Sequence, residues 1–325
     1  MHTVTLVARF GGNGMVRWLL ALSGASLVLS GASTLAAPPP PVEDYGKLPV
    51  MDHVTLSPSG QRYAFVATTG DQRRLIVATV ANQPLDALNV GKAKVEALEW
   101  AGEDHLLVHT SSTVELGMDF AVSKTELAGV TVVNLLTHKT LPIFGNPLQK
   151  RVAHTVVGSY GSASIGDHWY GYFGGYTYDY DAGGGGSVRK DSDGVLYPDL
   201  YRVDLDTGEI AQAAAGQSRL RDWLVAPTGE VVARLFYDDR SGDWRLRRTK
   251  PGGADLASGR SPTERVSVQG FGRTAQSVLI HIGGADHDVF EEAPLDGSAP
   301  TSYNADETGS PLFDPVSGLW IGEQD

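Results

Sequence analysis

The sequence predicts an all-β protein, a β-propeller built from four-stranded blades. Three observations predict it. Pairs of short apolar strands joined by tight turns recur along the chain, the turns fall about 43 residues apart, and strands such as YAFVA, LLVHT and VVARLF are apolar on both faces. A β-sandwich also has short strands at regular spacing, but it does not require two different hairpins in a fixed order within a 43-residue period.

The first hairpin of the repeating unit is clearest at residues 54–68, where Ser-Pro-Ser-Gly separates two apolar runs. Similar segments read EWAGEDHLLVHT, LVAPTGEVVARLF, QGFGRTAQSVLIHI and LFDPVSGLWIG. The residues that open the turns are Pro58, Ala101, Pro227, Gly272 and Pro315, with spacings of 43, 126, 45 and 43 residues. The long interval equals three times 42, which agrees with the period of the others.

A second, more polar hairpin follows the first in each unit. It reads LYRVDLDTGEIAQ (200–212), WRLRRTKPGGADL (244–256) and VFEEAPLDGSAP (289–300), and Val203, Leu246 and Val289 stand 43 residues apart. One unit is therefore strand–turn–strand–loop–strand–turn–strand, which is typical of a propeller blade.

The middle of the chain is less regular. Residues 159–175 predict a first hairpin and residues 129–145 the second hairpin of the preceding blade. Residues 176–199 read as an insertion, and its four consecutive glycines predict a mobile loop rather than a strand. We expect about five full blades and the first half of a sixth, hence an incomplete ring and a truncated propeller.

The N-terminus predicts export. Arg17 precedes an apolar stretch, and small residues follow up to Ala37, so residues 1–37 are expected to be a signal peptide cleaved near Ala37 rather than a stable membrane anchor. Met15 is an alternative start to Met1. Residues 38–49 form a proline-rich linker and residues 50–325 the propeller. The absence of cysteine fits a periplasmic or secreted protein.

The net charge and the sequence motifs limit the classes of function that we expect for the chain. The net charge of -12 argues against a nucleic-acid partner, and RLRRTK (245–250) is expected to be a solvated strand edge. The sequence lacks a G-x-S-x-G pentapeptide and a thiol. His105 and His109 lie about 13 Å apart if both are on one strand, too far to share a metal. DHD (286–288) and VDLDTGE (203–209) read as turns, and DSDG (191–194) lacks the remaining ligands of a calcium loop. We predict no catalytic residue, metal or cofactor.

Several segments resemble one family. YGKLPVMDHVTLSPSGQRYAFVA resembles the start of the propeller in secreted bacterial serine peptidases of the prolyl oligopeptidase family, which includes dipeptidyl and acylaminoacyl peptidases. KVEALEWAGEDHLLVHTSST and DLYRVDLDTGEIAQ…RDWLVAPTGEVVAR are similar to its later blades. The resemblance covers residues 43–325.

The resemblance implies a role in substrate access. In that family the propeller limits entry to an active site carried by an α/β-hydrolase domain that follows it. We expect this chain to lack that domain, so no catalytic residue is transferred. We expect a substrate-gating propeller that is inactive alone, with a peptide substrate or a missing C-terminal hydrolase domain as partner, and self-association through open propeller edges. The alternative is a freestanding periplasmic propeller of the TolB type that binds a protein or a small ligand.

Overall fold

The computed structural model describes residues 49–70, 72–91, 93–115, 124–146, 151–180, 186–249, 253–262, 265–284, 287–305 and 309–324. The predicted signal peptide, and the predicted linker up to residue 48, lie outside the described residues. All described residues belong to one structural unit, Leu48–Asp325. Within them, we find no helix with the length and hydropathy needed to cross a bilayer.

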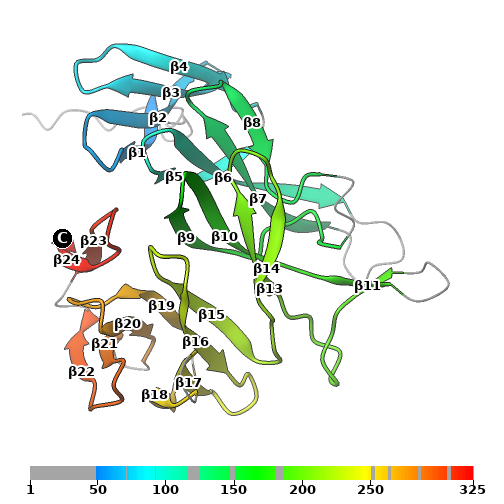
Figure 1. Cartoon of the computed structure of the whole chain (residues 1–325), viewed down its shortest axis with the longest axis vertical. Coiled ribbons are helices and arrows are strands. Elements are labelled where there is room, and N and C mark those ends of the chain that lie inside the picture. The colour runs from blue at the N-terminus through cyan, green and yellow to red at the C-terminus, as the bar shows by residue number, and fades with distance from the viewer. Residues whose placement is uncertain are drawn as a thin grey trace, which may run out of the picture. The chain divides into compact units, whose positions relative to one another are not determined.

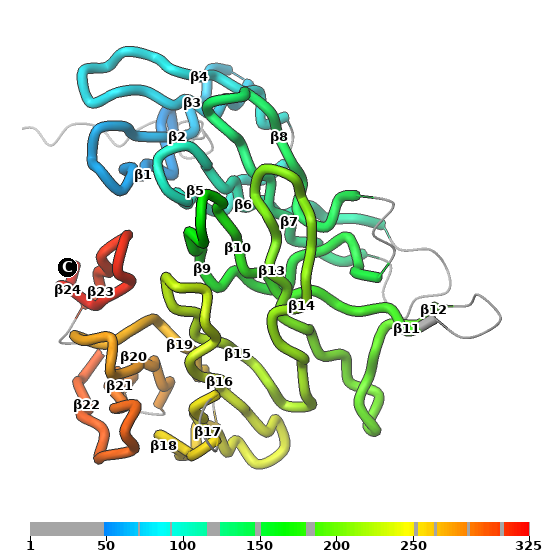
Figure 2. The backbone as a smooth tube through the Cα atoms, viewed as in Figure 1, coloured from blue at the N-terminus to red at the C-terminus, as the bar shows by residue number. Residues whose placement is uncertain are grey.

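Five four-stranded antiparallel sheets follow one another along the chain, and a two-stranded sheet comes last (Figures 1 and 2). We call the five sheets blades 1 to 5 and the last one the half-blade. This arrangement confirms the predicted all-β propeller with five full blades and a partial one.

The strands of each sheet are given in pairing order. Blade 1 holds β1 (Met51–Leu56), β2 (Arg62–Thr69), β3 (Gln72–Thr79) and β4 (Pro84–Asn89); blade 2 holds β5 (Lys94–Ala101), β6 (His105–Glu115), β7 (Lys124–Asn134) and β8 (Lys139–Pro142). Blade 3 holds β9 (Gly158–Ile165), β10 (His168–Gly175), β13 (Asp199–Asp204) and β14 (Ile210–Ala214). Blade 4 holds β15 (Leu220–Val225), β16 (Val231–Tyr237), β17 (Asp243–Arg248) and β18 (Asp255–Arg260). Blade 5 holds β19 (Val266–Phe271), β20 (Ser277–Ile282), β21 (Val289–Pro294) and β22 (Thr301–Asn304), and the half-blade holds β23 (Ser310–Phe313) and β24 (Trp320–Gln324).

The recurring Pro-containing turn closes the first hairpin of blades 1 and 4. The N–H of Gly60 donates to the carbonyl of Ser57 at 2.8 Å, and the N–H of Gly229 donates to the carbonyl of Ala226 at 2.7 Å. Both glycines have positive φ, 68° and 83°, which glycine adopts without strain. The Ser-Pro-Ser-Gly and Ala-Pro-Thr-Gly segments thus have the same local structure, as predicted.

The hydrophobic core lies between the blades rather than within any one of them. Five buried clusters are present among the described residues, and each joins one sheet to the next. Between blades 1 and 2, for example, Val66 and Val77 pack with Leu106 and Val108. Because inner blades are covered on both sides, their strands must be apolar on both faces, which explains the composition noted in the sequence.

Polar contacts cross the first two blade boundaries. Arg62 of blade 1 donates to the carbonyl of Glu103 in blade 2 at 2.9 Å. Between blades 2 and 3, Asp206 accepts hydrogen bonds from His105 Nε2 and Asn134 Nδ2, both at 2.7 Å.

The remaining boundaries use an aromatic pair, another arginine and a backbone N–H. Between blades 3 and 4 the rings of Tyr160 and Trp223 meet edge to face at 4.9 Å. Between blades 4 and 5, Arg248 donates to the carbonyl of Leu295 at 3.2 Å. The half-blade joins blade 5 through the N–H of Trp320, which donates to the carbonyl of Gly272 at 3.0 Å.

The long interval between Ala101 and Pro227 contains one inner hairpin, β9–β10, and not the two that its length suggests. The extra residues belong to the long strands β6 and β7 and to the predicted insertion. Within the insertion, β11 (Tyr178–Tyr180) pairs with β12 (Gly186–Val188). The last of the four glycines therefore does begin a strand, contrary to prediction, while the other three lie outside the described residues.

The half-blade and blade 1 are not joined by strand pairing among the residues that the structure describes. The described residues thus form no closed ring, which agrees with the predicted incomplete one. Exposed apolar side chains gather on these two sheets: Val54 and Leu56 on β1 are 58% and 61% exposed, and Leu312 and Ile321 of the half-blade are 48% and 59% exposed.

Candidate functional site

A pocket of about 480 Å³ lies where the innermost strands of the sheets meet. Every blade contributes to its lining through its first strand, β1, β5, β9, β15 or β19, and the half-blade contributes through Phe313 and the turn that follows it. We call it the axial pocket. Because its wall needs all six sheets, it exists only in the assembled propeller, where the ends of many strands bring distant residues together.

Asp222 on β15 is the most deeply placed charged group of the pocket. Its Oδ2 accepts the N–H of Val268 from blade 5 at 2.8 Å, and its Oδ1 accepts the N–H of Trp223 at 2.9 Å. Part of its surface remains accessible because it lines the pocket. Burial raises the pKa of its carboxyl from the ordinary 3.8 to about 6, although the two N–H donors act in the opposite direction.

An aromatic pair lies beside this carboxyl. Tyr160 and Trp223 both line the axial pocket, and burial, assisted by the charge of Asp222, raises the pKa of the Tyr160 hydroxyl. Tyr160 is therefore neutral at physiological pH. Its partly exposed ring, backed by the buried Trp223, gives the pocket an aromatic surface next to the carboxylate.

Glu99 on β5 supplies the second carboxylate of the pocket. Its Oε2 lies 3.1 Å from His109 Nε2 and accepts a long hydrogen bond of 3.5 Å from the Ser159 hydroxyl of blade 3. The side chain is 35% exposed, so it faces solvent inside the pocket. The Glu99 carboxylate lies between His109 and Ser159, which is not the order of a catalytic triad, in which the histidine contacts the serine.

The two histidines of the HLLVH segment lie on strand β6, as the sequence predicts, and have different partners. His105 is 4% exposed and contacts Asp206, whereas His109 contacts Glu99. They do not converge on one site. His105 belongs to the boundary between blades 2 and 3.

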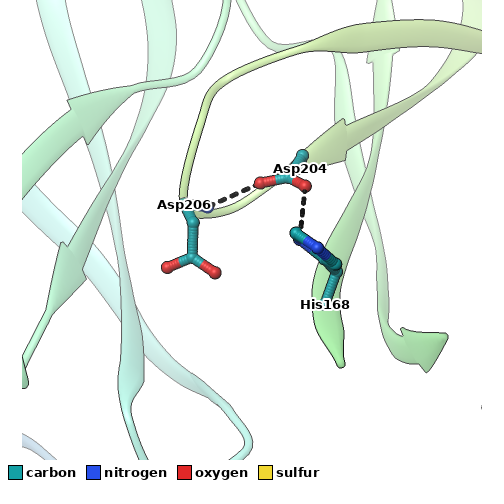
Figure 3. A group of neighbouring side chains, drawn as sticks. All are labelled: His168, Asp204 and Asp206. Carbon is teal, nitrogen blue, oxygen red and sulfur yellow. Dashed lines mark hydrogen bonds and ion pairs between the residues drawn. The ribbon is translucent and has the colours of Figure 1, made fainter. Parts of the chain in front are cut away.

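A group of potential metal ligands lies next to that boundary. His168, Asp204 and Asp206 place one ligand atom each within 4.8 Å of one another. Figure 3 shows the Asp204 carboxylate between His168 Nδ1, at 3.0 Å, and the backbone N–H of Asp206, at 2.9 Å. The carboxylate of Asp206 bonds instead to His105 and Asn134. Each of the three side chains thus has a protein partner. The contacts of Asp204 stabilise a turn, and those of Asp206 join blades 2 and 3.

The other acidic motifs of the sequence also serve turns. Asp191 accepts the N–H groups of Asp193 and Val195 at 3.0 and 2.9 Å. Asp288 contacts Arg265 at 3.0 Å and the N–H of Gly284 at 3.3 Å, while residue 286 lies outside the described residues. The turn interpretation of both segments agrees with this geometry.

Glu99 and Asp222 match no catalytic or binding motif in the sequence, and each reads as an ordinary polar position in a strand. One signal was present: an acidic residue in the first strand of a blade, directly before a tryptophan, in both EW (99–100) and DW (222–223). First strands line the axis, so charge there is informative.

No protein-family model and no curated protein match the sequence. Solved structures similar to this one include TolB from Acinetobacter baumannii, with 12% identity, a TM-score of 0.44, and 78% of this chain and 54% of that chain covered. They also include the acylaminoacyl peptidase of Pyrococcus horikoshii, with 12% identity, a TM-score of 0.44, and 82% and 40% covered. An oligogalacturonate lyase in complex with manganese has 11% identity, a TM-score of 0.46, and 83% and 69% covered.

The chain spans about half the length of that TolB and two fifths of that peptidase. The sheet order within this chain, rather than these distant likenesses, defines its fold. The comparisons leave the family of the chain unassigned.

Proposed function

We propose that the axial pocket binds an extended peptide segment, and that the chain acts as the substrate-admitting propeller of an exported serine peptidase. The observation that carries the binding role is the pocket itself, because six sheets contribute to one accessible wall. The resemblance of residues 43–325 to peptidase propellers supports the substrate class. Export is part of the proposal and rests on residues 1–37.

The chemistry of the pocket suits binding rather than bond cleavage. Its walls combine apolar and aromatic side chains with two carboxylates, and Ser159 contacts Glu99 rather than a histidine. A peptide in the pocket can contact the first strands of all five blades and aromatic residues among them. We therefore expect the chain to bind peptides and release them uncut.

Filling the axial pocket with a large side chain tests the proposed peptide binding. Ser162 on β9 lines it and is partly exposed, so Ser162→Trp places an indole inside. We expect this variant to weaken the binding of blocked pentapeptides, measured by isothermal titration calorimetry, by about tenfold or more, or about 1.4 kcal/mol. Mass spectrometry should recover the peptides intact.

The control is Ser298→Trp, which adds the same ring at an exposed turn of blade 5. It should bind as the unaltered chain does. Equal affinity in both variants, or cleavage of the peptide by the purified chain, would overturn the proposed function.

A further inference from the structure

The lining of the axial pocket carries negative charge only. Its charged members are Glu99 and Asp222, and no lysine, arginine or histidine is among the described residues that line it. The two carboxylates come from blades 2 and 4, so the charge is not a local feature of one turn. A ligand with a positive group is the electrostatic complement of such a wall.

Asp222 has no cationic partner in the part of the chain that the structure describes. Two backbone N–H groups are its hydrogen-bond donors. A carboxylate held this deep is costly to ionise unless a charge opposes it. A cation that enters the pocket would supply that charge, and Asp222 remains reachable from the pocket side.

The aromatic residues favour a cation on an aliphatic stem. Tyr160 and Phe313 are partly exposed aromatic residues of the lining, and Tyr160 meets the buried Trp223 edge to face at 4.9 Å beside Asp222. Aromatic faces attract ammonium and guanidinium groups, and apolar walls bury methylene stems. Lysine and arginine side chains combine these two features.

We propose that the axial pocket selects peptide segments that carry a lysine or arginine side chain, with the cationic head paired to Asp222 and further stabilised by Glu99. This inference rests on the proposed function, because it names the class of peptide that the same pocket takes. We therefore expect the pocket to prefer a cationic side chain over a neutral side chain of similar size.

The test compares three blocked pentapeptides, acetyl-Gly-Gly-Xaa-Gly-Gly-amide, in which Xaa is lysine, norleucine or glutamate. Norleucine keeps the aliphatic stem and removes the charge. By calorimetry at pH 7.5 we expect the lysine peptide to bind about tenfold more tightly than the norleucine peptide, as for a charge-assisted hydrogen bond, and the glutamate peptide to bind most weakly. The preference should shrink as salt is added.

Three variants test which residues cause the preference for lysine. Asp222→Asn should remove most of the lysine preference and Glu99→Gln part of it, while both keep the affinity for the norleucine peptide, which reports an intact pocket. Glu230→Gln is the matched control, since Glu230 is an exposed carboxylate of blade 4 outside the pocket. It should leave the preference unchanged.

The outcomes separate the two proposals. Equal binding of the lysine and norleucine peptides would overturn the charge preference while leaving peptide binding in place. No binding of any peptide would overturn both. If n-butylammonium chloride bound as tightly as the lysine peptide, the ligand would be a small amine, and the assignment to a peptide side chain would be wrong.

Discussion

At the scale of single residues, Asp222 shows how the fold sets the chemistry of a side chain. Its position on the first strand of blade 4 puts it near the axis, where blade 5 supplies the N–H of Val268. The same aspartate on an outer strand would be fully hydrated. Its raised pKa is thus a property of the assembled blades and not of the local sequence.

The first residue-scale prediction concerns stability and pH. The native state keeps the proton of Asp222 up to about pH 6, whereas the unfolded chain releases it near 3.8, so the native state binds more protons between these values. The free energy of unfolding contributed by this group therefore falls as pH rises through the window, by up to about 3 kcal/mol. Above pH 6 the contribution is constant.

Urea denaturation of the unaltered chain and of Asp222→Asn from about pH 4 to pH 7 measures this effect. Carboxyls with lowered pKa, such as Asp204, where the N–H groups of Thr207 and Asp206 outweigh burial, have the opposite slope. They are present in both proteins, so the difference between the two curves isolates Asp222. Parallel curves would show that Asp222 is not proton-linked to folding.

At the scale of elements, the insertion between β10 and β13 is held by an ion pair whose carboxylate is buried and whose guanidinium is partly exposed. Asp199 is 1% exposed and accepts hydrogen bonds from Arg189 at 2.9 Å, from the N–H of Gly216 at 2.6 Å and from the Thr177 hydroxyl. Arg189 follows β12 and also contacts Asp179 at 3.2 Å. The guanidinium of Arg189 thus links the hairpin β11–β12 to blade 3, together with the Thr177 hydroxyl.

The element-scale prediction removes that guanidinium. Arg189→Ala leaves the Asp199 carboxylate buried without a cation, and we expect a loss of about 2–3 kcal/mol in the free energy of unfolding, less than for a fully buried pair because Arg189 is partly exposed. Arg240→Ala is the control, because Arg240 makes an exposed ion pair with Asp193 in the same insertion. Its loss should stay below about 1 kcal/mol. Similar losses in both variants would contradict the anchoring role.

The hairpins were predictable and the pocket was not, for a physical reason. A turn such as Ser57–Gly60 is determined by neighbours in sequence, so Pro58 and Gly60 identify it without any tertiary information. The pocket residues Glu99 and Asp222 acquire their role only when separate blades meet. The 43-residue period likewise failed between Ala101 and Pro227, because strand extension and an insertion changed the spacing without changing the number of hairpins in blade 3.

At the scale of the whole molecule, two sheets present apolar side chains to solvent. Each inner blade is covered on both faces by its neighbours, but Val54 and Leu56 on β1, and Leu312 and Ile321 on the half-blade, remain exposed. Contiguous exposed apolar surface favours association, and edge strands add backbone groups that pair. This supports the proposal that copies of the chain associate through these sheets.

The whole-molecule prediction follows from those side chains. Sedimentation velocity should show concentration-dependent association of the unaltered chain, and Val54→Lys with Ile321→Lys should shift it towards monomer. Val195→Lys is the control, since Val195 is 55% exposed in the insertion between β12 and β13 and belongs to neither sheet. A monomer at all concentrations, or an equal effect of the control, would contradict association through these sheets.

The contacts between successive blades differ chemically from one boundary to the next. The first boundary uses an arginine and a carbonyl, and the second uses an aspartate with histidine and asparagine. The third uses an aromatic pair, the fourth a second arginine, and the last a backbone N–H. Chains made of similar units are prone to misassembly, in which one unit docks on the wrong neighbour during folding. Different contacts at adjacent junctions make such errors costly, because a wrong partner leaves a buried donor or acceptor unsatisfied. Adjacent junctions thus use different contacts, which favours the native order of the sheets along the chain, while the arginine–carbonyl contact serves both the first and the fourth junction.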